Sequence, residues 1–242
     1  AAHLPDSHPV LAIPASLKPQ DADTVRKAGV ELWDLKTLGK MFATQLRKLP
    51  VSFYSSLILA SLANGEHVAK QLSDSLAKCT PGKTEWLVYQ SLVGDILEEL
   101  FYPALGKPIA EHSDKARANR RDFIMPNYAE NGFWAFIRDK YQADYVVVDA
   151  KNYSRKAAKT DVLQIANYLK PHGAGMFGLV FSRLGGDTNG CEHTLREQWA
   201  LHRKLILILD DTDILAMLAA KAERRPPEEV LGQKLDAFRL SM

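Results

Sequence analysis

The stretch ADYVVVDAKNYSRK, Ala143 to Lys156, joins a run of valines to an aspartate and a lysine two positions apart. Side chains alternate between the two faces of a strand, so Asp149 and Lys151 share the face of Val147. A strand this apolar is expected inside a sheet, where charges are costly unless they pair with each other or with a ligand. The stretch predicts a buried strand that ends in a functional acid and base; the alternative is a plain surface ion pair.

Predicted strands and helices alternate on both sides of this stretch. Their alternation indicates an α/β fold with a central mixed β-sheet flanked by helices. We interpret the aromatic segment NGFWAFIRDKYQA, residues 131–143, as a connection between two strands. The predicted helices cover 84–102, 160–170, 192–203, 212–225 and 226–240, and the predicted strands cover 120–127, 144–153, 175–183 and 205–211.

The first 80 residues form a separate part of the predicted organisation. We divide the chain into an N-terminal α/β-to-helical segment, 1–80, and a main domain, 81–242. The order strand, helix, strand, helix near the N-terminus repeats the order near the C-terminus. This repetition has two explanations. It can be a coincidence, since any two units of this order look alike, or the N-terminal segment can be the end of a preceding domain of the same kind.

Composition places the chain among ordinary globular proteins. The 242 residues carry a net charge of +2, which permits a nucleic-acid partner without requiring one. Only two cysteines are present, without metal-ligand spacing, as expected for a reducing cytoplasm. The apolar run Val51 to Ala63 is shorter than the roughly 20 residues that a membrane span needs, so we expect a buried helix there and no membrane contact.

Acidic residues that could join Asp149 lie upstream of it. Asp122 opens the preceding predicted strand, and Glu85 lies in the first turn of the helix before that. Mg²⁺ prefers carboxylate and carbonyl oxygens, so these acids and the carbonyl of Ala150 are candidate ligands. Lys151 could orient a water molecule and offset charge on a phosphate. Glu85 could instead be a simple partner of the helix dipole.

The ordered set of Glu85, Asp122 and Asp149-Ala150-Lys151 resembles the PD-(D/E)xK, or restriction-endonuclease-like, nuclease superfamily. Gln164 and Tyr168 resemble the QxxxY motif of its RecB-like members; the alternative is two ordinary helix-surface residues. The chain departs from the pattern in having Arg121 before Asp122, where the motif has proline.

This resemblance implies a restriction-endonuclease-like core and a Mg²⁺-dependent DNA endonuclease, with Mn²⁺ able to replace Mg²⁺. It further implies a bacterial restriction or phage-defence setting. A separate hypothesis, suggested by an N-terminus that looks cut, is an effector domain that stays silent until an upstream sensor domain or homo-oligomerisation places two sites across a duplex. The alternative is a catalytically silent module of the same fold that binds nucleic acid or a partner protein. Residues expected at the DNA backbone flank the acidic strands: Arg120, Arg121, Asn152, Arg155, Lys156 and Lys159.

Other catalytic motifs are absent from the sequence. The segment PGKT lacks the first glycine of a phosphate-binding P-loop, since that position is Ala77. The histidines show no HExxH spacing, and there is no GxSxG segment, which argues against a zinc hydrolase and a serine hydrolase.

Overall fold

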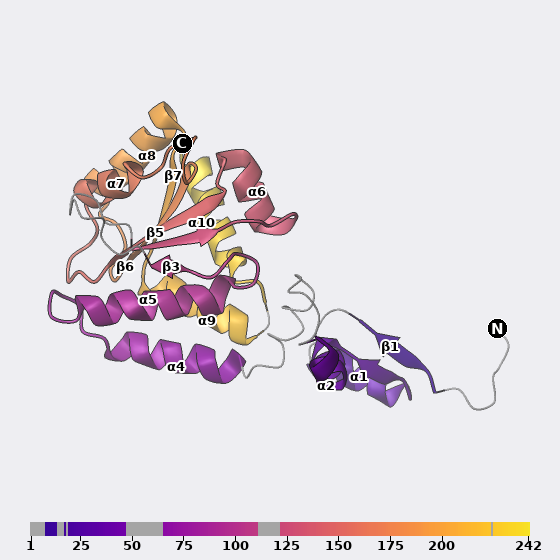
Figure 1. Cartoon of the computed structure of the whole chain (residues 1–242). Helices are drawn as coiled ribbons and strands as arrows, with labels where there is room; N and C mark the ends of the chain where they lie inside the picture. The colour runs from indigo at the N-terminus through magenta and orange to yellow at the C-terminus, as the bar shows by residue number, and fades with distance from the viewer. Residues whose placement is uncertain (1–7, 14–16, 18, 47–64, 111–121, 224) are drawn as a thin grey trace. The chain divides into compact units, whose positions relative to one another are not determined.

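The computed structural model describes residues 8–13, 17, 19–46, 65–110, 122–223 and 225–242 (Figure 1). The chain forms two compact units, Ala1–Gly65 and Glu66–Met242. The division falls before helix α4 (Gly65–Lys78), earlier than the predicted boundary after residue 80. The reason is packing: Ala69 and Leu76 of α4 are buried in the core of the C-terminal unit. The predicted helix at Val51–Ala63 lies outside the described residues.

The N-terminal unit has the predicted order of strand, helix, strand and helix. Strand β1 (Val10–Ala12) pairs in parallel with β2 (Glu31–Trp33), and helix α1 (Pro19–Lys27) connects them. Helix α2 (Leu35–Leu46) follows. The two strands make a small sheet of their own, distinct from the sheet of the C-terminal unit.

The C-terminal unit is built on the predicted mixed sheet. Its strand order is β3-β4-β5-β6-β7; β5, β6 and β7 are parallel, and β3 and β4 are antiparallel to their neighbours. The remaining helices and strands of the unit are α5 (Trp86–Phe101), β3 (Ile109–Ala110), β4 (Phe123–Pro126), α6 (Gly132–Tyr141), β5 (Tyr145–Lys151), α7 (Lys159–Ala166), β6 (Phe177–Ser182), α8 (Gly190–His202), β7 (Leu205–Leu209), α9 (Asp211–Ala222) and α10 (Glu228–Leu240).

The alternation of side chains along β5 divides the core into two layers. Val146 and Val148 join the larger cluster, to which α4, α5, α6, α9 and α10 contribute. Val147 joins the smaller cluster with Val162 of α7 and Cys191 of α8. Asp149 and Lys151 have the parity of Val147, so they lie on the face of the sheet that α7 and α8 cover.

One predicted connection is a helix. Segment 131–143 contains α6, which buries Trp134, Ile137 and Tyr141. These positions are three or four residues apart, so they share one helix face. The segment does connect two strands, as interpreted, but its helical form was not predicted because its aromatic content hid this period. The edge strand β3, only two residues long, was also not predicted.

No helix in the described parts of the chain is long and apolar enough to cross a membrane.

Candidate active site

The site lies at the C-terminal end of β5, where the apolar strand gives way to charge. Asp149 is 1% exposed and Lys151 is 8% exposed. The Lys151 ammonium lies 2.7 Å from Oδ2 of Asp149. The prediction that the two side chains share a face and form a buried pair is confirmed, and the alternative of a surface ion pair is excluded.

Helix α7 supplies the second contact of the lysine. Nζ of Lys151 donates a hydrogen bond of 3.1 Å to Oε1 of Gln164. The N-terminal turn of α7 is held by Asp161, whose Oδ2 accepts hydrogen bonds from the Ala158 N–H at 2.8 Å and from Arg155 at 3.0 Å. The helix that follows the strand thus gives the Lys151 ammonium a second partner besides Asp149.

The QxxxY pattern predicts that Tyr168 lies on the same helix as Gln164, but Tyr168 follows the end of that helix. Helix α7 ends at Ala166, and the Tyr168 N–H donates to the Ile165 carbonyl at 3.0 Å, which is a tighter turn than the α-helix. Tyr168 then packs against the smaller core cluster. Gln164 of this predicted pair bonds to Lys151.

Asp122 reaches the site from the neighbouring strand. Phe123 pairs with Val148 in the antiparallel register of β4 and β5, which confirms the predicted strand pairing. One step further, that register sets Asp122 opposite Asp149. Oδ2 of Asp122 accepts the backbone N–H of Ala150 at 2.7 Å, so Asp122 is held directly at the end of β5.

Gln90 of α5 is a site residue that the sequence motifs did not include. Its Nε2 donates a hydrogen bond of 2.7 Å to Oδ1 of Asp122. The two oxygens of Asp122 are therefore oriented by an amide from the helix and an amide from the strand. A neutral glutamine has no place in an acidic motif, and its only signal in the sequence is its position one turn into α5.

Burial dominates the electrostatics of Asp149. Desolvation raises its pKa to about 7; the Lys151 ammonium opposes this shift and the Asp122 carboxylate adds to it. Burial alone would lower the pKa of Lys151, but attraction to Asp149 outweighs it and the net direction is upward. The lysine is thus charged at neutral pH, whereas the aspartate is poised between its two protonation states.

Glu85 does not join the two aspartates. It is the N-cap residue of α5, and its carboxylate accepts a hydrogen bond from the Thr80 backbone N–H. Within the described residues, no three acids, histidines or cysteines form a group that could hold a metal ion. The predicted set of three carboxylates is therefore corrected to a pair, because Glu85 faces the preceding loop.

Two carboxylates nevertheless fit a Mg²⁺ ion. This cation is usually bound by one or two carboxylates, with water and substrate phosphate as the other ligands. Oδ1 of Asp149 is buried without a hydrogen-bond partner among the described residues, and Oδ2 has only the Lys151 ion pair. Buried carboxylate oxygens are rarely left this way, and a cation would satisfy them.

Asn152 was predicted to contact DNA, but its side chain is used inside the protein. It is 5% exposed. Its Nδ2 donates to the carbonyls of Thr80 at 2.9 Å and Gly82 at 3.0 Å, and its Oδ1 accepts from Arg183 at 3.1 Å. Both ends of the amide are occupied, so the residue anchors the loop before α5 and does not face a substrate.

Arg183, which follows β6, joins three parts of the unit behind the site. It is 7% exposed and forms an ion pair of 2.7 Å with Asp211 at the start of α9. Its guanidinium also donates to the carbonyls of Leu76 at 3.1 Å and Cys79 at 2.7 Å, at the end of α4. Carbonyls at the end of a helix lack N–H donors within that helix, and Arg183 donates the hydrogen bonds that these two would otherwise miss.

The remaining predicted DNA contacts have different surroundings. Arg155, Lys156 and Lys159 are exposed near the end of β5 and the start of α7. Arg155 is already in an ion pair with Asp161 and lies over the Tyr153 ring, 4.3 Å from its centroid. Arg120 and Arg121 lie outside the described residues.

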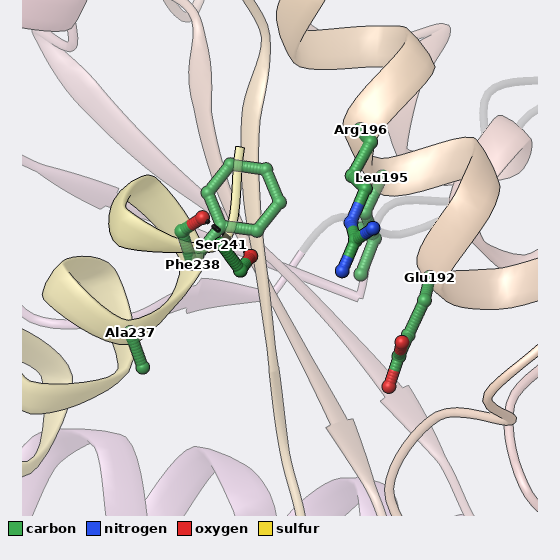
Figure 2. A pocket seen from close by; sticks show the side chains of 6 residues that line it. All are labelled: Glu192, Leu195, Arg196, Ala237, Phe238 and Ser241. Carbon is green, nitrogen blue, oxygen red and sulfur yellow. Dashed lines mark hydrogen bonds between the residues drawn. The ribbon is translucent and has the colours of Figure 1, made fainter.

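A shallow pocket of about 270 Å³ lies elsewhere in the unit, between α8 and α10. Figure 2 shows Phe238 of α10 and Ser241, which follows α10, on one side and Leu195 and Arg196 of α8 on the other. None of the residues of the candidate site lines it. The pocket has no part in the chemistry at the end of β5.

Comparisons with known proteins add one distant likeness. No family model and no curated protein sequence matches the chain. Among solved structures, the chain is similar to the restriction endonuclease FokI bound to DNA, with 14% identity and a TM-score of 0.43. The likeness covers 81% of this chain and 32% of that one, so this chain spans about a third of that protein. The fold and site themselves define an α/β protein in which two acids and a lysine gather at the C-terminal end of the central strand β5.

Proposed function

We propose that the protein is a metal-dependent nuclease of the restriction-endonuclease-like type, acting on DNA with Mg²⁺, for which Mn²⁺ can substitute. The observation that carries the proposal is the cluster itself: Asp149 and Asp122 on adjacent strand ends, with the Lys151 ammonium 2.7 Å from Asp149. Two acids and a lysine at the ends of two neighbouring strands are suited to phosphodiester hydrolysis.

Asp122 and Asp149 are the residues that would hold the cation. The Ala150 N–H points toward Asp122, and in an antiparallel pair a residue directs its N–H and carbonyl to the same side. The Ala150 carbonyl is thus a candidate third ligand. When bound, the cation would supply a Lewis acid for the phosphate and would lower the pKa of a bound water.

Lys151 and Gln164 supply the protein's own contribution. The ammonium is fixed between the Asp149 carboxylate and the Gln164 amide oxygen, so it is oriented before substrate arrives. Lys151 would hold the attacking water and offset negative charge that develops on the phosphate. The exposed Lys156 and Lys159 would contact the DNA backbone and contribute binding without sequence preference.

A setting in bacterial restriction or phage defence follows from the family resemblance of the motif and is proposed on that ground alone.

Cleavage of plasmid DNA tests the proposal. We expect wild type to nick plasmid with Mg²⁺ or Mn²⁺ and not with EDTA. Lys151→Ala and Asp122→Asn should each lose at least a hundredfold in rate, as expected for catalytic groups of this kind. Lys140→Ala, which changes an exposed lysine of α6, is the matched control and should cleave like wild type. Circular dichroism establishes that each variant is folded. Equal nicking by wild type and Lys151→Ala would overturn the assignment.

A binding module without catalysis is the second candidate. The observation that favours it is the lack of a third acidic ligand among the described residues. Binding of DNA that is unaffected by EDTA, together with no cleavage under any cation, would support this alternative over the nuclease.

A further inference from the structure

Trp86 is an exposed aromatic side chain at the start of α5, the helix whose Gln90 contacts the candidate site. It is 44% exposed, the most exposed of the four tryptophans. Trp134 is buried, and Trp33 and Trp199 are partly buried. An indole of this exposure on a partly apolar surface is a typical ligand-contacting group.

The helix places Trp86 at the edge where Asp122 lies. Trp86 is the first residue of α5, and Gln90 lies four residues on, hence on the same side of the helix. Gln90 bonds directly to Asp122. Trp86 therefore lies one helical turn, about 5.4 Å, beyond the residue that holds the catalytic carboxylate.

The direction of the side chain takes it further toward solvent. Tyr89 and Val93 on the same side of α5 are buried against the sheet. Side chains lean toward the N-terminus of their helix, so the Trp86 ring extends past the last buried turn. This explains how a residue on the core-facing side is still 44% exposed.

The loop before α5 is fixed to the end of β5. Asn152, next to Lys151, donates to the Thr80 and Gly82 carbonyls, and the Gly82 N–H donates to the Asn152 carbonyl at 2.8 Å. Lys83 is exposed on this loop. The three hydrogen bonds fix the backbone of the loop that carries Lys83 and leads into α5.

We propose that Trp86 stacks on an unpaired base beside the scissile phosphate and that Lys83 contacts the adjoining phosphate. The inference rests on the proposed function and names its substrate class: single-stranded DNA, or a duplex with unpaired bases at the cleavage point. Trp86 is suited to this contact by its position one helical turn from Gln90, the residue that bonds to Asp122.

We expect a preference for unpaired bases because a tryptophan ring stacks only on a base whose face is accessible. Inside a duplex, both faces of each base are covered by neighbouring base pairs, whereas an unpaired base leaves a face open for stacking. Stacking on an aromatic side chain is tolerant of sequence. Trp86 would therefore select the structure of the DNA and not its sequence.

Binding of fluorescent oligonucleotides tests the inference. The oligonucleotides are single-stranded, fully paired, and paired with a single-stranded extension, and Ca²⁺ replaces Mg²⁺ to hold the complex. We expect wild type to bind the two that contain unpaired bases more tightly. Trp86→Ala should weaken that binding roughly 5- to 150-fold, the range measured for stacking of one base. Trp86→Phe should stay within about threefold of wild type.

Matched controls separate stacking from general effects. Tyr128→Ala removes another exposed aromatic residue, beyond the opposite end of β4, and should not change binding. Lys83→Ala should weaken binding to paired and unpaired DNA alike and reduce its salt dependence. Tryptophan fluorescence should be quenched by single-stranded DNA in wild type and much less in Trp86→Phe, a readout that does not require Trp86→Ala to fold.

The two proposals fail in different ways. If wild type cleaves DNA and Lys151→Ala does not, but Trp86→Ala binds all three oligonucleotides like wild type, the stacking inference is overturned and the nuclease stands. If wild type prefers fully paired DNA, the substrate class is likewise wrong. If wild type neither binds nor cleaves any DNA, both proposals fall.

Discussion

Replacing Lys151 with methionine should make the stability of the C-terminal unit depend on pH in a new range. The pKa of Asp149 is raised to about 7 by burial, against an ordinary value of about 3.9 in an unfolded chain. The folded protein therefore holds this proton more tightly than the unfolded chain. The resulting stabilisation is complete below about pH 4 and is lost as the pH rises to about 7.

Without Lys151 this loss continues to higher pH. The ammonium is the group that lowers the pKa of Asp149, so its removal raises that pKa further. Each pH unit between the old and the new pKa costs about 1.4 kcal/mol. Lys151→Met should therefore lose up to about 1.4 kcal/mol relative to wild type for each pH unit above pH 7. Below about pH 5 Asp149 is protonated in both proteins, so the difference no longer depends on its titration.

Urea unfolding followed by circular dichroism, at pH 5 to 9 with EDTA, measures this difference. The double variant Asp149→Asn/Lys151→Met has no carboxyl at this position, so we expect its stability relative to wild type to lack the steep fall above pH 7. Curves for wild type and Lys151→Met that stay parallel from pH 5 to pH 9 would refute the reasoning, because they would show that Lys151 does not control the protonation of Asp149.

Two further predictions concern the framework and the cation. Arg183→Met should reduce the free energy of unfolding by about 3–5 kcal/mol, since it leaves Asp211 and the carbonyls of Leu76 and Cys79 without their partner. The exposed Arg203→Met should cost under about 1 kcal/mol in the same urea titration. Mg²⁺ affinity without DNA should be about tenfold weaker at pH 6 than at pH 8, because a pKa of about 7 leaves about a tenth of Asp149 ionised at pH 6. Calorimetric titration measures it, and an affinity that does not change with pH would contradict the assignment of Asp149 as a ligand.

The sequence predicted those parts of the site that follow from strand periodicity. The alternation in β5 set Asp149 and Lys151 on one face, and the apolar run before them predicted their burial. The order of elements also predicted that the strand of Asp122 pairs with β5. These features depend on local pattern and on the pairing of neighbouring elements, which the sequence displays directly.

Features that depend on distant contacts could not be predicted. Gln90 meets Asp122 across 32 residues, and Arg183 meets the α4 carbonyls across more than 100. Every residue has a backbone carbonyl, so the sequence does not indicate which carbonyls accept a hydrogen bond from Arg183. Glu85 was placed correctly at the start of α5, but the direction of its side chain depended on the Thr80 loop, which periodicity does not describe.

The contacts of the Arg183 guanidinium also determine where the chain can be shortened without disturbing the C-terminal unit. Two of its acceptors, the carbonyls of Leu76 and Cys79, lie upstream of residue 81, where periodicity alone would start the main domain. A fragment that begins at residue 81 would expose the inner side of α5. It would also remove two of the hydrogen-bond acceptors of the buried Arg183 guanidinium. Helix α4 is thus an integral wall of the C-terminal unit, and a dissection that preserves the site begins at or before residue 66.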